Sequence, residues 1–227
     1  MFRFLGFPTK GAKVLHALEY KKSHLGKTAK LVVELPDGKV ESYFLKILLM
    51  GEIGRKMCEG EYESLKAIYE VSAGFVPKSY YWGEYDKNTQ PYFLLEEFRD
   101  IGKQPADPIT LATKLADLHK HSKSPMGKFG FHVKTCHDGA TGEAFVFDAC
   151  SFYGHNEYDT GNWRASRHLL SDEKYMECYK ENFPGSEPVE DWDARNLLYS
   201  LPFNLGNAMY IPESDQRQVV YEDMMTL

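Results

Sequence analysis

Three charged residues of this chain have the types and the settings needed to hold a phosphate chain and a metal ion. Lys46 interrupts the apolar run F-L-K-I, Glu61 follows in a segment with helical spacing, and Asp148 ends the apolar run F-V-F-D. A strand lysine can bind nucleotide phosphates when a carboxylate of the next helix holds it in place. A carboxylate fixed at a strand end is a suitable oxygen ligand for Mg²⁺. Together these residues could position and neutralise phosphates during phosphoryl transfer.

Each of these residues also has a structural interpretation. Lys46 could be an ordinary charge at a strand edge and Glu61 a solvated helix residue, because lysine and glutamate are rarely buried unless they are paired. Asp148 could cap its strand or the turn that follows. The order of the elements around Lys46 and Glu61 adds weight to a phosphate site.

The elements that would position Lys46 and Glu61 alternate between strands and a helix. An Asp-Gly pair at positions 37 and 38 predicts a hairpin between two β-rich runs. Apolar residues at spacings of three and four predict the helix that follows. The predicted elements are strands at 29–35 and 40–49, a helix at 52–70, and strands at 79–84 and 92–98. From this order we expect a small α+β lobe.

The chain changes character after residue 98. Gly102, Pro105 and Pro108 indicate a connector, and the periodicity beyond it is mainly helical. We expect helices at 108–122, 172–182, 189–200 and 213–225, and one strand at 144–148. The predicted domains are a β-rich nucleotide-binding lobe at 27–98 and a mainly helical lobe at 99–227, preceded by an atypical segment at 1–26.

The composition of the chain narrows the classes of protein to which it could belong. With 43% hydrophobic and 26% charged residues, the 227-residue chain is typical of a soluble globular protein. No apolar run approaches the roughly 20 residues that span a bilayer. The net charge of -6 argues against a nucleic-acid surface. The four cysteines are scattered without a C-x-x-C pair, so we expect reduced thiols in the cytoplasm and no zinc site or disulfide framework.

Six segments of the chain resemble the fructosamine and ketosamine 3-kinases, above all fungal proteins of the protein-ribulosamine 3-kinase-like type. The resemblance runs in order from about Lys27 to the C-terminus, and the F-D-x-x-S-F-Y-G-H-x-E-Y-D run is its most specific part. The segments are E-G-E-Y-E-S-L-K-A-I (59–68), F-V-P-K (75–78), Y-F-L-L-E-E-F (92–98), L-A-D-L-H-K (115–120), G-K-F-G-F (127–131) and F-D-A-C-S-F-Y-G-H-N-E-Y-D (147–159).

This resemblance implies a two-lobed α+β fold of the protein-kinase-like, aminoglycoside-phosphotransferase-like type. It also implies use of ATP and Mg²⁺ to phosphorylate the 3-hydroxyl of ketosamines, which are ribulosamine and fructosamine adducts on amines. The partners would be glycated proteins or small ketosamines, in protein deglycation. We expect no nucleic-acid or membrane partner.

The resemblance also assigns roles to residues. Lys46 would bind the α- and β-phosphates, Glu61 would orient Lys46, and Asp148 would ligate magnesium. The connector at Glu97 and Phe98 would face the adenine.

Residues of the specific run and just beyond it have two interpretations each. Tyr153, His155 and Glu157 could contact the sugar acceptor, or they could pack and hydrogen-bond locally, which we slightly favour. A basic group further on could meet a substrate phosphate or an acidic partner, although a solvated helix face is the simpler interpretation. This group is Arg164, Arg167 and His168.

The chain departs from the family where the catalytic base should be. Family members carry H-G-D-x-W-x-G-N before the F-D strand, which supplies the base and a second metal ligand. Here residues 133–141 separate the flanking landmarks, and H-G-D does not occur in the sequence. Asp138 stands in H-D-G, and Glu143 stands where the asparagine would fall. We interpret Asp138 as an exposed turn residue, so the catalytic base stays unknown.

Three hypotheses follow from this departure. The chain could be an active ketosamine 3-kinase, a catalytically inactive kinase-like protein that binds nucleotide or a partner, or a non-functional abridged product. An abridged helical lobe should expose the apolar face of the 108–122 helix, which is Leu111, Leu115 and Leu118. Residues 23–28, with one glycine, stand where the family has a loop over the phosphates.

Overall fold

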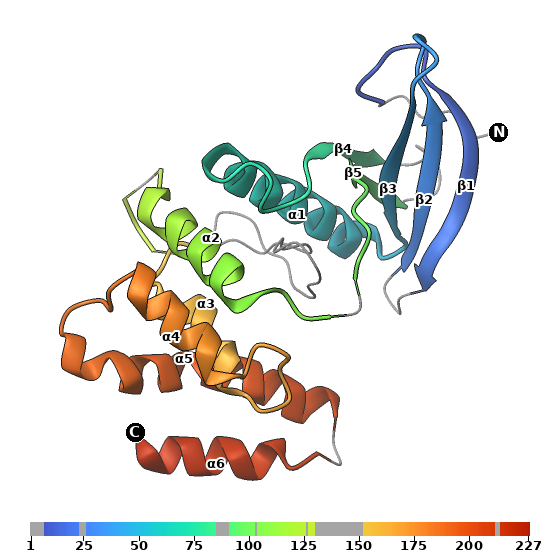
Figure 1. The fold of residues 1–227 in the computed structure, drawn as a ribbon. Coiled ribbons are helices and arrows are strands. Elements are labelled where there is room, and N and C mark those ends of the chain that lie inside the picture. The colour runs from blue at the N-terminus through green and yellow to red at the C-terminus, as the bar shows by residue number, and fades with distance from the viewer. Residues whose placement is uncertain are drawn as a thin grey trace. The chain divides into compact units, whose positions relative to one another are not determined.

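The structure is a computed structural model that describes residues 7–22, 26–84, 91–102, 104–125, 127–129, 152–211 and 214–227. The chain divides into two compact units (Figure 1). Unit 1 comprises Met1–Lys103 and Phe131–Phe152, and unit 2 comprises Gln104–Gly130 and Tyr153–Leu227.

Unit 1 contains a five-stranded antiparallel sheet in the order β1-β2-β3-β5-β4 and the long helix α1. Its elements are β1 (Lys13–Lys22), β2 (Gly26–Glu34), β3 (Val40–Leu48), α1 (Gly51–Val71), β4 (Ser79–Glu84) and β5 (Tyr92–Glu97). In the β2–β3 turn, Asp37 accepts a hydrogen bond from the Lys39 amide and Gly38 has φ 83°. The hairpin, the helix and the second strand pair predicted from the sequence are confirmed.

Strand β1 was missed by the sequence reasoning, which treated its residues as an atypical segment. It lies at the edge of the sheet, where Leu15 and Leu18 are exposed, so its apolar residues show no clear inside-outside alternation. The expectation of a loop extending to residue 28 is wrong, because Gly26 already begins β2. A Cβ on Gly26 would lie 2.2 Å from the Ile47 carbonyl oxygen, so only glycine allows this close approach.

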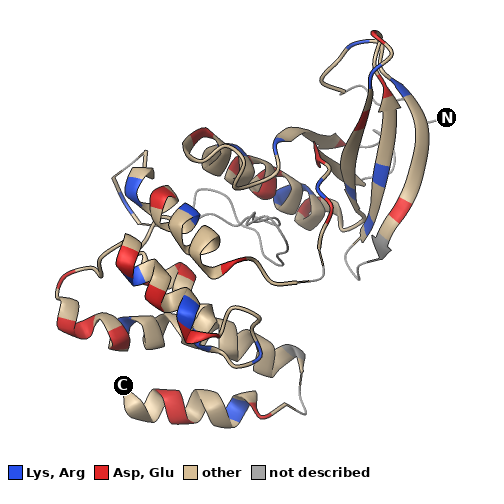
Figure 2. Ribbon diagram, viewed as in Figure 1, with Lys and Arg blue, Asp and Glu red and all other residues tan. Residues whose placement is uncertain are grey.

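Helix α1 packs against unit 1's sheet through a buried stripe. Gly54, Cys58, Glu61 and Leu65 are buried at helical spacing. A Cβ on Gly54 would lie 3.2 Å from that of Leu48, so the glycine lets the helix approach β3. Both acidic and basic residues occur along the helix in Figure 2. Glu61 lies on the buried stripe, whereas no other acidic residue of α1 is buried.

The other face of the sheet carries a separate apolar core. Its buried residues come from β2, β3 and β5, two from each strand. They are Leu31, Val33, Tyr43, Leu45, Phe93 and Leu95. Side chains alternate between faces along a strand, so the residues between these positions, such as Phe44 and Lys46, project toward the α1 side.

Unit 2 is helical. It contains α2 (Pro108–His121), α3 (Glu157–Gly161), η1 (Asn162–Arg164), α4 (Glu173–Asn182), η2 (Val189–Asp191), α5 (Trp192–Tyr210) and α6 (Gln216–Thr226). Asp107 caps α2 by accepting a hydrogen bond of 2.8 Å from the Thr110 amide. The four predicted helices are confirmed, although α5 continues past Pro202; the predicted strand at 144–148 lies outside the described residues. No described helix has the length and apolar character needed to cross a bilayer.

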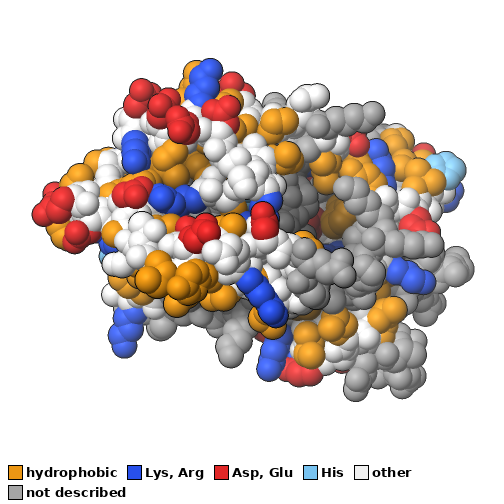
Figure 3. All heavy atoms as spheres, turned by 90° about the horizontal axis from the view of Figure 1, so that it is seen from below, with side chains coloured by type: hydrophobic (Ala, Val, Ile, Leu, Met, Phe, Trp, Pro, Cys, Tyr) orange, Lys and Arg blue, Asp and Glu red, His pale blue; other side chains and the backbone are white. Residues whose placement is uncertain are grey.

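The expected exposure of the α2 leucines is wrong. Leu111, Leu115 and Leu118 are all buried, and α2 packs against α4, whose buried residues are Tyr175 and Tyr179. Exposed hydrophobic side chains occur instead on α5 and α6, and hydrophobic side chains reach the surface of the face seen in Figure 3. Those of α5 and α6 are Leu198, Leu205, Met209, Tyr221, Met224 and Met225.

Candidate functional site

The structure brings Lys46 and Glu61 together inside unit 1. Lys46 lies on β3, which is flanked by β2 and β5, and its Nζ lies 2.8 Å from Glu61 Oε2 on α1. The side chains are 14% and 6% exposed. Removing one partner of a pair so shielded from water would leave the other charge unpaired in a poorly solvated place. The pair fixes the position of the lysine ammonium on the α1 side of the sheet.

Cys58 lies one helical turn before Glu61 on the same buried stripe. Burial, aided by the charge of Glu61 and opposed by that of Lys46, raises the pKa of the Cys58 thiol to about 12. The thiol is therefore protonated at neutral pH and is a poor nucleophile. We assign Cys58 to packing around the ion pair and give it no chemical role.

Glu97 ends β5, and its side chain is held by its neighbours in unit 1. Its Oε2 accepts hydrogen bonds from the Lys78 amide at 3.1 Å and from Arg99 Nη2 at 3.0 Å. Arg99 also donates to the carbonyl oxygens of Gly74 and Val76. These bonds tie the start of the connector to the segment between α1 and β4. If the connector meets a ligand near Glu97, it does so through its backbone.

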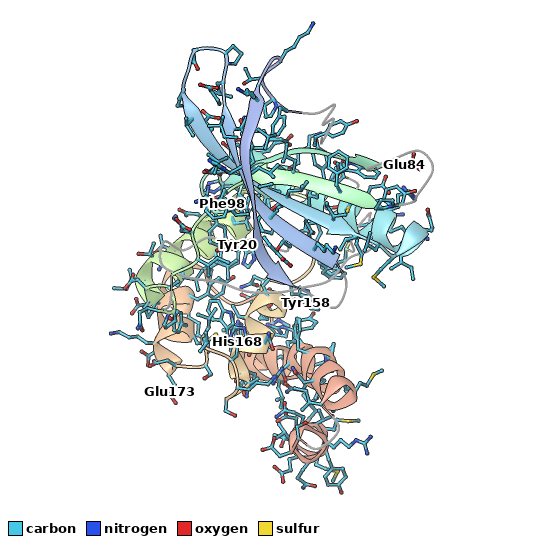
Figure 4. All side chains as sticks on the ribbon, turned by 90° about the vertical axis from the view of Figure 1, so that its right-hand side faces the viewer. Tyr20, Glu84, Phe98, Tyr158, His168 and Glu173 are labelled. Carbon is cyan, nitrogen blue, oxygen red and sulfur yellow. The ribbon has the colours of Figure 1, made fainter. Side chains whose placement is uncertain are left out.

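Phe98 belongs to an aromatic group that the sequence reasoning missed. Its ring meets the Tyr20 ring edge-on at 5.3 Å, and Tyr20 meets Phe44 at 6.0 Å (Figure 4). The Lys30 ammonium lies 4.0 Å from the centroid of the Phe98 ring. Phe44 could have been found, because it stands two residues before Lys46 and so shares its face. Tyr20 could not, because β1 had not been predicted.

Asp148, the predicted magnesium ligand, lies outside the described residues, as do residues 133–141. In the part of the chain that the structure describes, no group of three or more His, Cys, Asp or Glu side chains is placed to hold a metal ion. The carboxylate chemistry of Asp148 suits magnesium, and its assignment stays a prediction from the sequence.

Glu157 of unit 2 is fully buried and lies in an internal polar network. Its Oε1 accepts hydrogen bonds from the Ser186 amide at 2.9 Å and from Arg195 Nη2 at 3.0 Å, and Oε2 accepts from the Ser186 hydroxyl. Burial acts to raise the pKa of Glu157, but hydrogen bonds from the backbone, Arg195 and Ser186 outweigh it and hold the pKa below its ordinary value. This environment favours the structural interpretation of Glu157.

His155 and Tyr153 lie nearer the surface of unit 2. The Nδ1 atom of His155 lies 2.6 Å from the Tyr199 hydroxyl, and its ring packs against Phe129. Burial raises the pKa of Tyr199, so this hydroxyl is protonated and can donate to the imidazole. His155 is thus oriented by α5 while remaining partly accessible.

A second histidine network joins three helices of unit 2. His119 on α2 lies between the Tyr179 hydroxyl of α4, 2.6 Å from Nδ1, and Asp159 Oδ2 of α3, 2.9 Å from Nε2. The Asp159 carboxylate can only accept, so a neutral His119 carries its proton on Nε2 and accepts at Nδ1 from the Tyr179 hydroxyl. His119 and Asp159 stand in two of the segments that carry the resemblance, but only the fold shows that they pair.

The basic group after the specific run does not form a solvated helix face. Arg164 donates to Asp193 Oδ1 at 2.6 Å, and Arg167 donates to side-chain oxygens of Asn204 and Gln216. The Nδ1 atom of His168 accepts a hydrogen bond from the Leu170 amide. The expected helix is absent at Arg167 and His168, which lie in the turn after η1, whereas the expected exposure to solvent is found for Arg164 and Arg167.

Several solved structures share this fold. A candidate fructosamine-3-kinase from Haemophilus somnus 129PT matches with a TM-score of 0.67 and 15% identity over 94% of this chain and 91% of that one. A thermostable mutant of aminoglycoside phosphotransferase APH(4)-Ia, solved with AMP-PNP and hygromycin B, matches with a TM-score of 0.54 and 9% identity over 93% of this chain and 90% of that one. The chain thus has a protein-kinase-like α+β fold, as predicted.

The sequence model of the fructosamine kinase family matches residues 13–140, more than half of the chain. The chain belongs to this family, and the match includes β1. Chloroplastic protein-ribulosamine 3-kinases are 39% identical in Oryza sativa subsp. indica and 37% identical in Arabidopsis thaliana, each over 92 residues. These alignments cover 40% of this chain but 25% and 27% of the relatives, so the chain matches about a quarter of their length.

Proposed function

We propose that this chain is an ATP-dependent kinase that phosphorylates the 3-hydroxyl of ketosamines, the ribulosamine and fructosamine adducts on protein amines, and so acts in protein deglycation. The observation that carries the proposal is the shielded ion pair between Lys46 and Glu61. Phosphoryl transfer depends mainly on positioning and on cations placed at the phosphate oxygens. A lysine held by a helix carboxylate supplies such a cation, and membership of the fructosamine kinase family supports this use.

Unit 1 would bind the nucleotide. Lys46 would contact the α- and β-phosphates while Glu61 keeps its ammonium in place. The backbone at Glu97 and Phe98 would meet the adenine, and the rings of Phe98 and Tyr20 would offer apolar area beside it. An aromatic surface suits a planar base because stacking buries both faces without needing polar partners.

Asp148 would hold Mg²⁺, which when bound would supply positive charge to the phosphates of the nucleotide. The acceptor sugar would meet polar and aromatic side chains of the specific run. His155 and Tyr153 fit this role better than Glu157, whose buried oxygens already accept bonds from Ser186 and Arg195.

The domain assignment belongs to the same proposal. Residues 27–98 would be the nucleotide-binding lobe and 99–227 the acceptor lobe, abridged near 133–141. A reducing compartment such as the cytoplasm fits the two described cysteines, Cys58 and Cys178, which form no disulfide.

A second candidate function is nucleotide binding without turnover. The sequence favours it at one point, because H-G-D occurs nowhere in it and no residue is assigned as the catalytic base. Losing a base and a metal ligand that act as a unit would reduce the rate steeply even where ATP still binds. A non-functional abridged product is the remaining alternative.

Two measurements on the full chain separate these functions. Calorimetry with ATP and Mg²⁺ measures binding, and transfer of labelled phosphate from ATP to ribulosamine and fructosamine measures turnover. We expect both, with both lost in Lys46→Met and turnover lost in Asp148→Ala. Lys66→Met, on the exposed face of α1, is the matched control and should keep both.

The outcomes distinguish the candidates. Binding without turnover would support the second candidate and contradict the kinase. Turnover that survives both Lys46→Met and Asp148→Ala would sink the assigned site. A chain that neither binds ATP nor unfolds cooperatively would be an abridged product.

A further inference from the structure

Lys30 shares the α1 side of unit 1's sheet with Lys46. In the antiparallel register, Lys30 of β2 lies opposite Phe44 of β3, and Phe44 lies opposite Glu96 of β5. Residues directly opposite each other in an antiparallel pair project to the same face of the sheet. The three side chains therefore form a row across the strands, with a cation on one side of the Phe44 ring and a carboxylate on the other.

Lys30 lies closer than Lys46 to the connector that follows β5. The register places Lys46 opposite Thr28, two residues before Lys30 on β2. The row of Lys30 is thus displaced from Lys46 in the direction in which β5 runs to Phe98. The Lys30 ammonium continues this displacement, because it lies 4.0 Å from the centroid of the Phe98 ring. If Lys46 contacts the phosphates of a nucleotide, Lys30 lies at the end of the site that would receive the base.

The charge of Lys30 is not neutralised by any carboxylate within the described residues. Glu96 of the same row is two strands away, which is about 10 Å at the spacing of paired strands. The cation–π contact with Phe98 orients the ammonium and leaves its charge in place. An ammonium carries three hydrogen-bond donors and no acceptor. Lys30 thus presents donors beside an aromatic group. The rings are those of Tyr20, Phe44 and Phe98, and Tyr20 and Phe98 lie next to each other in Figure 4.

The two purine bases offer different edges to such a donor. Guanine carries two neighbouring acceptors, O6 and N7, whereas adenine carries the N7 acceptor beside an amino group at N6. A lysine can donate to both acceptors of guanine, which is among the commonest specific contacts with that base. Beside adenine it can donate to N7 alone, and the N6 amino group is itself a donor. A lysine at the base end of the site therefore favours guanine, relative to an apolar residue in the same place.

We propose that Lys30 lets unit 1 bind guanine nucleotides as well as adenine nucleotides, by donating hydrogen bonds to O6 and N7 of a guanine that packs against the rings. The flexible stem of lysine allows its ammonium to leave the Phe98 ring and follow the edge of the base. This inference rests on the proposed function, since it takes Lys46 and the connector as the two ends of the nucleotide site. It makes GTP a phosphate donor for the same reaction and Lys30 a residue that sets base specificity.

Calorimetry on the full chain with Mg²⁺ tests the inference with three nucleoside triphosphates. ATP carries the N6 amino group, GTP carries O6, and ITP carries O6 but lacks the exocyclic amino group of guanine. We expect GTP and ITP each to bind no more than about tenfold more weakly than ATP. A greater loss for either would overturn the inference, while the binding of ATP would leave the proposed function standing. If none of the three binds, the nucleotide site itself is contradicted, and the inference with it.

Substitutions of Lys30 locate the effect. Lys30→Met keeps an unbranched side chain but removes the donors, so it should weaken GTP and ITP at least about tenfold and ATP less than about threefold. Lys30→Arg, which can also donate to O6 and N7, should keep the binding of GTP. Lys13→Met, which removes an exposed lysine of β1, is the matched control and should change none of the three affinities.

The ratio of the GTP affinity to the ATP affinity separates base recognition from a structural role, because both affinities are measured on one preparation of each variant. An unchanged ratio in Lys30→Met would overturn the inference even if both affinities fell. An equal change of the ratio in Lys30→Met and Lys13→Met would show a general effect of charge and would also contradict the assignment.

Discussion

Lys46 and Glu61 stand on different elements of unit 1, and their charged atoms lie 2.8 Å apart with little exposure to water. The strand residue projects toward α1 because it alternates with Leu45, which faces the other core. The helix residue faces the sheet because it shares a stripe with Cys58 and Leu65. Two independent periodicities therefore direct opposite charges to one place.

Removing the carboxylate of this pair should destabilise the protein. In Glu61→Gln, the Lys46 ammonium would lose its charged partner in a shielded setting, so the free energy of unfolding should fall by about 3 kcal/mol. Urea unfolding measures this change. Glu63→Gln, an exposed acid of the same helix, should change it by less than about 0.5 kcal/mol. Equal effects of the two substitutions would contradict a stabilising role for the pair.

Cys58 should resist alkylation while the protein is folded. A thiol with a pKa of about 12 carries roughly a thousandfold less thiolate at neutral pH than one with the ordinary value of 9.0. Iodoacetamide labelling with peptide mapping should therefore modify the partly exposed Cys178 well before Cys58, and urea should remove the difference. Labelling of both at one rate in the folded protein would refute this prediction.

The same thiol should make stability depend on alkaline pH. The folded pKa of Cys58 lies above the unfolded one, so its contribution is complete below pH 9.0 and is lost as pH rises toward about 12. Buried tyrosines such as Tyr43, whose pKa is also raised, act in the same direction. Comparing the pH dependence of the free energy of unfolding in Cys58→Ala with that of the natural chain isolates the contribution of the cysteine. We expect a shallower decline in Cys58→Ala; an identical decline would exclude the thiol as a cause.

The network around His119 should stabilise unit 2. In His119→Ala, the fully buried Tyr179 hydroxyl loses its acceptor and Asp159 loses its donor. An unsatisfied buried polar group costs about 1–3 kcal/mol, and thermal or urea unfolding should show a loss of this size. His121→Ala is the control, since His121 is exposed and, among the residues that the structure describes, bonds only the Asp117 carbonyl oxygen of its own helix. If the two variants are equally stable, the three-helix network contributes nothing.

Glu157 should make unit 2 sensitive to acid. Its folded pKa is held below the ordinary value of 4.5, so its contribution is present above pH 4.5 and is lost as pH falls through the lowered folded value. Glu157→Gln should lower the free energy of unfolding at neutral pH by about 2 kcal/mol and should flatten its decline between neutral and acidic pH. Glu190→Gln is the control. Glu190 is exposed and stands between Ser186 and Arg195 in the sequence, and its substitution should leave that decline unchanged. If the free energy of unfolding of Glu157→Gln falls with acid as steeply as that of the natural chain, other groups cause the acid sensitivity.

The sequence determined most helices and strands of this protein and, for several residues, the face of the element on which they lie. The Asp-Gly turn, the spacing of apolar residues in α1 and α2, and the alternation along β3 are local properties, because each depends on backbone geometry over a few residues. They were enough to predict the α+β order and to single out Lys46 and Glu61. They failed for β1, an edge strand whose exposed leucines give no alternation.

The tertiary structure decided which distant side chains satisfy one another. Glu157 is bound by Arg195, His119 by Asp159, and Arg167 by Gln216, and no spacing in the sequence predicts such pairs. The physical reason is that a buried polar group must find its partner wherever the packing of helices brings one within hydrogen-bond reach. Periodicity tells which face of an element is buried, whereas the partner on the facing element is set by the fold.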